Sequence, residues 1–506
     1  MSKYKSIATD FGSPMPHCIT YMQAATGHMK PILGANDEAG FFIWQNGKWD
    51  YLTGLNTWED QGVRAMKRLQ EPGFFERVDR EQRASCNALE LHAFRLRDAD
   101  ISVYSNEDLA KEYRSLSNEW IRMCVWGHVI NVLDFEHYAL SHKIMDFIEA
   151  KRVENNVSES TAELFSILTT PAERSLFIKQ DEHFLEMLKA VQSDKSLLVL
   201  FETDENSILT GVHRFPVLDK PLDSHVRQFD WMQYHYDGPE ILDRAYFIRL
   251  LKAELHQNAN AEEQLRQMRE KQKELAVKQR DMENRMEFSG EERLWIQVAR
   301  ACVHLKGLRK DVIFRSSRNV RGFLTEIGKR LGVSLKHVRY LTMDEAEALL
   351  KKNQRADETE LETRLQKSVF YADNGRMTIF TGNHVEKYRS LIVAEEAQVD
   401  VRELKGTPAC AGVARGTVKI IVHADEMGKM NEGDILVSVA TNPNLVPAMK
   451  KAAAIVTDEG GLTCHAAIVS REMGIPCIVG TKKATKAFKD GDEVEVNATN
   501  GIVRKL

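Results

Sequence analysis

Two segments near the ends of residues 1–395 alternate apolar and polar residues, which is the pattern of half-buried β-strands. FFIWQNGKWDYL at 41–52 does so on either side of Asn46-Gly47, and SVFYADNGRMTIFTG does so around Asn374-Gly375. An Asn-Gly pair adopts the positive φ angles that a two-residue hairpin turn requires. The sequence therefore predicts two β-hairpins.

Most of the chain between these hairpins has apolar residues three and four positions apart, which predicts long amphipathic helices. Segments 56–195 and 292–332 show this spacing most clearly, and Gly332 is a predicted C-terminal cap. Residues 196–240 hold several Pro and Gly residues and predict a less regular passage. Segment 249–287 is rich in Glu, Lys, Arg and Gln, which predicts an exposed charged helical hairpin or a short coiled coil.

The pattern changes after about residue 398 to short apolar runs separated by glycines, such as GVARGTVKIIV, GDILVSV and IPCIVG. These runs predict a β-rich domain of ordinary size. The predicted fold class is multidomain α+β. We expect a mainly helical body at 1–395, a linker at 396–406 and a second domain at 407–506.

Composition narrows the function classes. A chain of 506 residues exceeds what one hydrophobic core usually serves, and a net charge of −5 does not suggest nucleic-acid binding. The start lacks the design of a signal peptide, and no apolar run approaches the roughly 18 residues of a membrane span. We expect a cytoplasmic protein without membrane contact. The seven scattered cysteines lack zinc spacing and predict reduced thiols without a structural metal.

The stretch TDEGGLTCHAAIVSREMGIPCIVG at 457–480 carries the candidate chemistry. An apolar strand runs into Gly460-Gly461, a helix is expected to begin near His465, and Gly474 is expected to end it. The N-terminus of a helix presents free amide groups and a partial positive charge, which favour an anion such as phosphate. His465 at that terminus is a nucleophile that can form a phosphoramidate.

Neighbouring residues have predicted supporting roles. Thr463 can donate its hydroxyl to the imidazole or to the phosphoryl oxygens, and Arg471 can neutralise developing charge. The alternative is that Thr463 only caps the helix and that Arg471 lies on a solvated face. Gly460, Gly461 and Cys464 are the candidate phosphate-binding residues.

This stretch resembles the phosphohistidine signature of the phosphoenolpyruvate-utilising enzymes, which include phosphoenolpyruvate synthase, pyruvate phosphate dikinase and rifampin phosphotransferase. The resemblance extends over 401–506, and Cys464 stands where many members have Ser. It implies that 407–506 is a swivelling β/β/α phosphohistidine domain and that His465 is the phosphorylated residue.

The order of a helical body followed by this domain resembles the larger subunit of phenylphosphate synthase. The resemblance implies an ATP-dependent dikinase-type phosphotransferase whose separate ATP-grasp subunit passes a phosphoryl group to His465. A small organic acceptor bound by the body then receives it. Mg²⁺ is expected with ATP on the partner, and a homo-oligomer is a further expectation.

The candidate acceptor pocket draws on polar residues of the body, each with a structural alternative. His128 lies in a helical segment where a core histidine is the commoner case. His235 and Asp237 lie in an aromatic, Pro- and Gly-interrupted segment of the kind that often carries function. Arg315 and Arg318 share a helix face, which is otherwise usually solvated.

Two other functions stay open on the sequence alone. His465 can relay phosphate between proteins as a non-catalytic carrier, with the body as a scaffold. The chain can also be a regulatory protein whose body senses a metabolite. A concave cavity in the body that His465 reaches would favour the enzyme.

Overall fold

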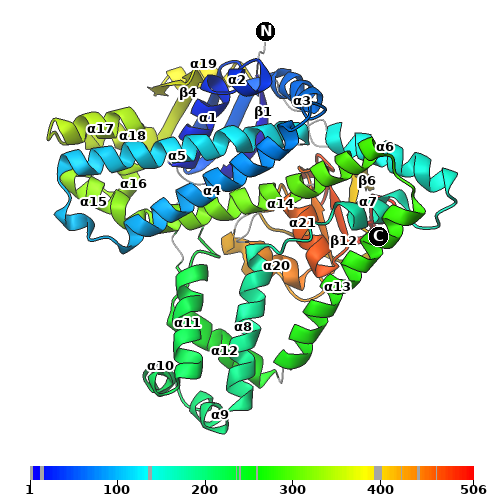
Figure 1. The fold of residues 1–506 in the computed structure, drawn as a ribbon. Helices are drawn as coiled ribbons and strands as arrows, with labels where there is room; N and C mark the ends of the chain where they lie inside the picture. Colours follow the sequence, from blue (N-terminus) through cyan, green and yellow to red (C-terminus); the bar gives the residue numbers. More distant parts are fainter. Residues whose placement is uncertain are drawn as a thin grey trace.

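The computed structural model describes residues 4–11, 16–134, 139–234, 236, 238, 241–257, 260–392, 402–422, 424–441, 445–462 and 464–506. The chain forms a large body, with an antiparallel sheet at one end, and a C-terminal domain built on a second sheet (Figure 1). The predicted division into a large helical part and a β-rich C-terminal part is confirmed at this level.

The body contains a five-stranded antiparallel sheet in the order β1-β3-β2-β4-β5. Its strands are β1 (Tyr4–Phe11), β2 (Gly40–Gln45), β3 (Lys48–Gly54), β4 (Lys367–Asp373) and β5 (Arg376–Thr381). Both predicted hairpins are confirmed, and Asn46, Gly47, Asn374 and Gly375 all have positive φ. The pairing of β2 with β4 joins segments more than 300 residues apart, which no local pattern predicts.

Helices cover both faces of this sheet. α1 (His17–Gly27) packs on β2, β4 and β5, and α19 (His384–Arg389) packs on β4 and β5 from the other side. The backbone of α1 lies very close to the turn between β4 and β5. A Cβ added to Gly27 would lie only 2.7 Å from Gly375 Cα, so glycine allows this approach. The short helices beside the sheet are α2 (Lys30–Leu33) and α3 (Thr57–Arg68).

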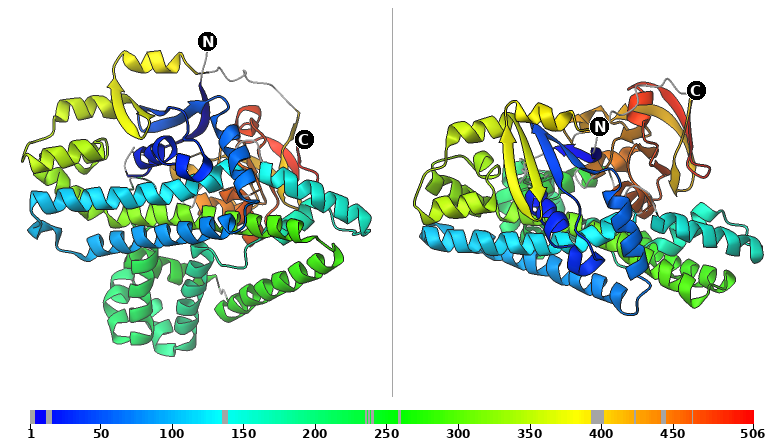
Figure 2. Two further views of the ribbon diagram at one scale, coloured as in Figure 1. Left: turned by 45° about the horizontal axis from the view of Figure 1, so that its top comes forward. Right: turned by 90° about the horizontal axis from the view of Figure 1, so that it is seen from above.

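Three long helices form the centre of the body and confirm the predicted helical segments. They are α4 (Phe74–Asp98), α5 (Asn106–Leu133) and α14 (Gly290–Asn319), and they lie side by side in all views (Figure 2). α5 begins with a capping box in which Ser105 and Asp108 satisfy each other's free amide groups. α6 (Ala139–Glu154) and α7 (Thr161–Thr169) extend this layer toward the C-terminal domain.

The passage 196–240, predicted to be less regular, is helical over most of its described length, so that prediction was wrong. Pro216 occupies the first turn of its helix, where the missing amide hydrogen costs nothing. With its neighbours the passage builds a lobe with its own hydrophobic core, seen below the body in Figure 1. Its helices are α8 (Leu176–Ser193), α9 (Lys195–Phe201), α10 (Glu205–Gly211), α11 (Pro216–Phe229) and α12 (Arg244–His256).

The charged segment 249–287 forms the end of α12 and the whole of α13 (Ala261–Arg285). α13 packs mainly on α7 and α8, whereas α12 packs mainly on α8, α10 and α11. The two helices therefore do not form the predicted hairpin or coiled coil with each other. Only a few side chains of α13, such as Leu265 and Met282, are buried.

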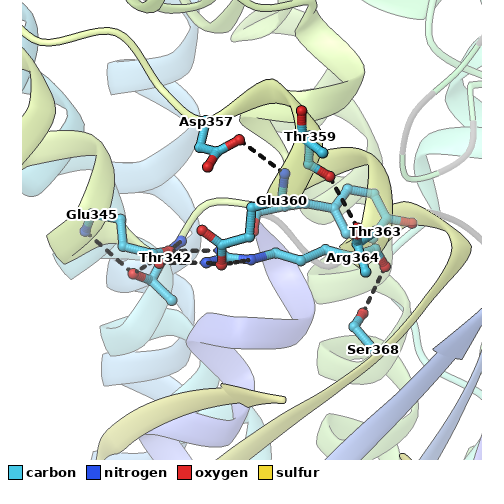
Figure 3. Close-up of polar contacts among 9 residues, drawn as sticks. Thr342, Glu345, Asp357, Thr359, Glu360, Thr363, Arg364 and Ser368 are labelled. Carbon is cyan, nitrogen blue, oxygen red and sulfur yellow. Dashed lines mark hydrogen bonds and ion pairs between the residues drawn. The ribbon is translucent and has the colours of Figure 1, made fainter. Parts of the chain in front are cut away.

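The helices after α14 connect it back to the sheet. They are α15 (Arg321–Leu331), α16 (Leu335–Val338), α17 (Met343–Lys351) and α18 (Glu358–Gln366). Gly332 ends α15 with a φ of 70°, which confirms its predicted role. The Arg364 guanidinium, 5% exposed, ties α18 to α17 through Glu345 and also bonds Glu360 (Figure 3).

The C-terminal domain has an eight-stranded sheet in the order β6-β13-β12-β8-β9-β10-β11-β7. Pairs β8-β9, β9-β10 and β10-β11 are parallel, and the other described pairs are antiparallel. The strands are β6 (Glu403–Lys405), β7 (Thr407–Cys410), β8 (Val413–Ile420), β9 (Ile435–Ser438), β10 (Ala454–Thr457), β11 (Cys477–Val479), β12 (Glu493–Asn497) and β13 (Ile502–Lys505). Its helices are α20 (Val446–Lys451), α21 (His465–Met473) and α22 (Ala484–Ala487).

This domain is packed onto the body. α21 lies on α14, β7 lies on α7, and apolar residues of both parts form one continuous core. Lys450 Nζ also reaches the Asp181 carboxylate of α8 at 3.1 Å. Residues 393–401 lie outside the described chain, but Glu403–Lys405 pair with β13. This part of the predicted linker is therefore a strand of the domain.

Among the helices described above, none has the combination of length and apolar character that crossing a bilayer requires.

Replacing Arg364 with Ala should lower the free energy of unfolding by about 2 kcal/mol, because the Glu345 side chain, 35% exposed, loses its buried partner. Glu360→Ala should cost less than about 1 kcal/mol, since the Glu360 side chain is 54% exposed. Urea unfolding followed by circular dichroism measures both changes. Equal losses in the two variants would contradict the assignment of Arg364 to the α17–α18 contact.

Candidate active site

His465 is the first residue of α21 and follows a tight turn after β10. Gly460 has a φ of 105°, which only glycine adopts readily, and an added Cβ would lie 2.7 Å from Cys464 Sγ. Cys464 is the N-cap residue, with extended backbone angles, so α21 begins directly behind it. The free amide groups of the first turn of α21 therefore lie beside the histidine. Gly474, with a φ of 73°, ends α21 as predicted.

The imidazole of His465 is fixed by a bond from its Nδ1 to Thr441 Oγ1, at 2.8 Å. In the tautomer whose Nδ1–H donates to this hydroxyl, Nε2 carries the lone pair and is the nucleophilic nitrogen. Burial, together with the charge of Lys310, holds the pKa of His465 well below its usual range. The ring is therefore neutral at physiological pH, which is the form that accepts a phosphoryl group.

His465 lines a cavity of about 240 Å³ between the C-terminal domain and the body. The turn before α21 contributes Gly460, Gly461 and Cys464 to the same wall. The body contributes mostly aromatic side chains. Those from α1, the sheet and α3 are His17, Tyr21, Phe42, Trp49, Tyr51 and Trp58, and Tyr236 comes from the stretch between α11 and α12. An apolar cavity of about 150 Å³ can hold benzene, so this one has room for a one-ring compound with polar substituents.

Another part of the cavity wall holds three cations of α14, and the acidic residues Asp134 and Glu459 also line the cavity. Lys306, Arg309 and Lys310 come from one face of α14, because residues three and four apart on a helix are neighbours. Lys310 Nζ donates to the Thr441 carbonyl at 3.1 Å, and Arg309 Nη2 donates to Asn131 Oδ1 at 2.9 Å. Burial lowers the pKa of Lys306. These side chains suit a phosphoryl group more than a neutral ligand.

Sequence reasoning missed this basic face and selected Arg315 and Arg318, which lie further along the same helix. Arg315 pairs with Glu90, and Arg318 Nη2 pairs with Asp230 Oδ2 at 2.7 Å. Neither lines the cavity. The spacing of Lys306, Lys310 and Ile313 could have indicated this face. It puts two cations and an apolar residue on one side of a helix that is otherwise largely buried.

The other predicted residues divide into three groups. Gly460, Gly461 and Cys464 lie on the cavity wall with His465, and their predicted binding of phosphate stays a prediction. Arg471 lies elsewhere: its Nε donates to the Ala409 carbonyl at 2.8 Å and its guanidinium covers the Phe165 ring. It is six residues from His465 and so points from another face of α21. Thr463, His235 and Asp237 lie outside the described residues.

His128 is fully buried and does not line the cavity. It lies directly behind the wall, where its Nδ1 is 2.9 Å from Tyr21 Oη and its Nε2 is 3.0 Å from Asp37 Oδ1. The predicted acceptor-pocket residue His128 therefore contacts Tyr21, which lines the cavity, but does not line the cavity itself.

In the described part of the chain, no group of three or more His, Cys, Asp and Glu side chains is arranged to hold a metal ion. The charged wall of the cavity is mainly cationic, which does not fit a magnesium site.

Comparison with known proteins agrees with the geometry of the C-terminal domain. Residues 430–501 match the family model described as "PEP-utilising enzyme, mobile domain". The chain is 53% identical over 137 residues to the phosphoenolpyruvate synthase of Pyrococcus furiosus, which covers 26% of this chain and 17% of that protein. It is 60% identical over 111 residues to a probable phosphoenolpyruvate synthase of Archaeoglobus fulgidus, which covers 22% and 15%.

A probable phosphoenolpyruvate synthase of Pyrococcus abyssi is 40% identical over 201 residues, or 39% of this chain and 24% of that protein. The chain thus spans about a quarter or less of the length of these relatives. The C-terminal domain is therefore similar to the mobile domain of phosphoenolpyruvate-utilising enzymes, and the likeness of the chain to these proteins rests on this region.

Gly460→Ala should slow phosphorylation of His465 by at least about 10-fold, because both the φ angle and the contact with Cys464 oppose a Cβ. Gly474→Ala is the matched control: its φ is also positive, but nothing lies within 4 Å of the added carbon. Rates of acid-labile label incorporation compare the two. A Gly474 variant as slow as the Gly460 variant would show that backbone strain alone, without the Cys464 contact, explains the loss.

A second cavity, of about 250 Å³, lies between parts of α14 and α21. Gly307 and Ile468 line both this cavity and the one that contains His465. Burial raises the pKa of Asp311 to about 8 and that of Glu472 to about 7. The charge of Glu472 adds to the rise at Asp311, and the charge of Asp181 adds to the rise at Glu472. Ser175 Oγ donates to Glu472 at 3.1 Å. Other titratable side chains around this cavity are Arg83, Glu90, Glu173, Arg174, Lys179 and His304.

If these carboxyls regain their usual pKa values of about 4 when the domain undocks, docking should be strongest below about pH 4, weaken as the pH rises from there to about 8, and then level off. Hydrogen exchange of α21 amides across this range measures the change. The double variant Asp311→Asn and Glu472→Gln should show a flatter pH dependence. An unchanged pH dependence in that variant would assign the effect to other groups.

Proposed function

We propose that this chain is a subunit of an ATP-dependent phosphotransferase of the dikinase type. His465 receives a phosphoryl group from a separate ATP-grasp protein and passes it to a small organic acceptor held in the cavity. The observation that carries the proposal is the shared cavity: His465 forms one wall, while α14 and the aromatic residues of the body form the others. A phosphohistidine and an acceptor can therefore meet away from bulk water.

The walls support a flat, largely apolar acceptor with an oxygen nucleophile. Phe42, Trp49 and Trp58 offer aromatic surface that stacks against rings but gives few hydrogen bonds. The cations of α14 lie on another part of the wall, where the phosphoryl group would be. The acceptor ring and the phosphoryl group thus have separate, chemically matched places.

Transfer relies on charge stabilisation. The phosphoryl group on Nε2 would lie at the N-terminus of α21 and near Lys306, Arg309 and Lys310, which together offset its negative charge. When the N–P bond breaks, the electron pair returns to Nε2, and Nδ1–H stays bonded to Thr441. Mg²⁺ is assigned to the ATP-binding partner, where it would neutralise the polyphosphate.

The enclosed cavity also supports an enzyme over a non-catalytic carrier. A carrier needs an exposed phosphohistidine and a surface for its partner proteins. His465 instead faces a cavity lined by aromatic and cationic side chains. A relay function would leave these side chains without a role.

Incubation with β- and γ-labelled ATP in separate reactions, with and without an ATP-grasp protein, tests the proposal. Acid-labile label on His465 should come from the β position and only with the partner present. His465→Ala should remove the label and keep the fold, because the side chain is half-buried and loses one hydrogen bond worth about 1 kcal/mol. Label from phosphoenolpyruvate instead of ATP would overturn the proposed donor, and no label from either would overturn the proposed function.

A further inference from the structure

One tyrosine on the cavity wall is connected to a buried carboxylate. Tyr21 Oη lies 2.9 Å from His128 Nδ1, and His128 Nε2 lies 3.0 Å from Asp37 Oδ1. His128 is 0% exposed and Asp37 is 6% exposed, while Tyr21 lines the cavity with His465. The three side chains come from α1, α5 and the segment before β2, so the fold assembles them from distant positions.

The hydrogen-bond partners determine where the protons lie. A carboxylate only accepts, so His128 donates its Nε2–H to Asp37, and Nδ1 then carries a lone pair that accepts the Tyr21 hydroxyl proton. Asn131 Nδ2 donates to Tyr21 Oη at 3.3 Å. One lone pair of the tyrosine oxygen is left to accept a further hydrogen bond.

His17 is the other histidine on the cavity wall, and it is a poor candidate for taking a proton. Burial, Arg309 and Lys310 lower the pKa of His17 to about 3. Its Nδ1 lies 3.7 Å from Cys124 Sγ, which gives an imidazolium little support. His128 has a different partner, because its Nε2 lies 3.0 Å from the Asp37 carboxylate.

We propose that Tyr21, His128 and Asp37 form a proton relay that activates the acceptor hydroxyl for attack on phospho-His465. Tyr21 touches the acceptor and takes its proton, and His128 and Asp37 are positioning residues that act through Tyr21. This inference rests on the proposed function.

The step balances as follows. The acceptor oxygen forms a bond to phosphorus while the phosphorus–Nε2 bond of His465 breaks, and its electron pair returns to Nε2. The acceptor proton passes to Tyr21 Oη, and the Tyr21 proton passes to His128 Nδ1, which leaves an imidazolium beside Asp37. After the product departs, the proton returns by the same two bonds to water.

Tyr21 cannot act alone as a phenolate base. Burial raises its pKa above the usual range, so the hydroxyl stays protonated at neutral pH. Tyr21 can therefore accept the acceptor's proton only if it gives its own hydroxyl proton to His128 in the same step. The Asp37 carboxylate fixes the His128 tautomer that makes this possible, as the buried aspartate does in a Ser-His-Asp triad.

The reverse reaction tests the relay with this chain alone. Phenyl phosphate and 4-nitrophenyl phosphate are the probes, and label on His465 is the readout. In this direction Tyr21 protonates the departing oxygen, which phenolate requires and 4-nitrophenolate, a much weaker base, does not. Tyr21→Phe should slow labelling by phenyl phosphate about 100-fold and labelling by 4-nitrophenyl phosphate less than about 3-fold. Asp37→Asn should show the same preference between the esters.

Tyr51→Phe is the matched control, because Tyr51 is a second buried tyrosine of the cavity whose hydroxyl has no histidine partner among the described residues. Any effect of that variant should be equal for both esters. Equal slowing of both esters by Tyr21→Phe would reduce Tyr21 to a structural role and overturn the relay. So would the absence of labelling by either ester in a protein whose His465 accepts label from ATP, a result that leaves the proposed function intact.

Discussion

The contact of α21 with α14 is the interaction on which the site depends. α14 has 30 residues, about 45 Å of helix, and packs on both α4 and α5, so its basic face is held by the centre of the body. α21 carries His465 to that face. Neither domain alone encloses the cavity, because the nucleophile belongs to one and the cations and aromatic walls belong to the other. A domain that docks and leaves would therefore open and close the whole site in one movement.

Local elements were predictable because their signals lie within a few residues. The two Asn-Gly hairpins, the glycine caps at Gly332 and Gly474, and the turn before His465 all follow from the backbone angles that these residues favour. The passage 196–240 shows the limit of this reasoning. Its prolines indicated irregular structure, but Pro216 lies in the first turn of α11, where a helix tolerates it, and α11 continues past Pro221.

The part of the cavity wall that the body contributes was not predictable for a different reason. Its wall collects residues from α1, β2, β3, α3, α5 and α14, which only the tertiary fold brings together. A sequence shows that α14 carries several cations, but not which of its faces meets the C-terminal domain. For this reason Arg315 and Arg318 were selected, while Lys306, Arg309 and Lys310 were missed. His128 was selected for its chemistry, and the fold gives it a position behind Tyr21 that its neighbours in sequence do not indicate.

The charges of the cavity explain why its occupant should be an anion. Lys306, Arg309 and Lys310 outnumber Asp134 and Glu459 on the wall, so the formal charge of these side chains around the cavity is net positive. A phosphoryl group on His465 would add negative charge at the point where α21 already presents its amide groups. In the proposed reaction the loaded histidine would thus fit the docked position better than the unloaded one. After transfer, His465 no longer carries the negative charge that the cations of α14 attract. The electrostatics that stabilise the phosphoryl group before transfer would therefore favour docking less once His465 has given it up.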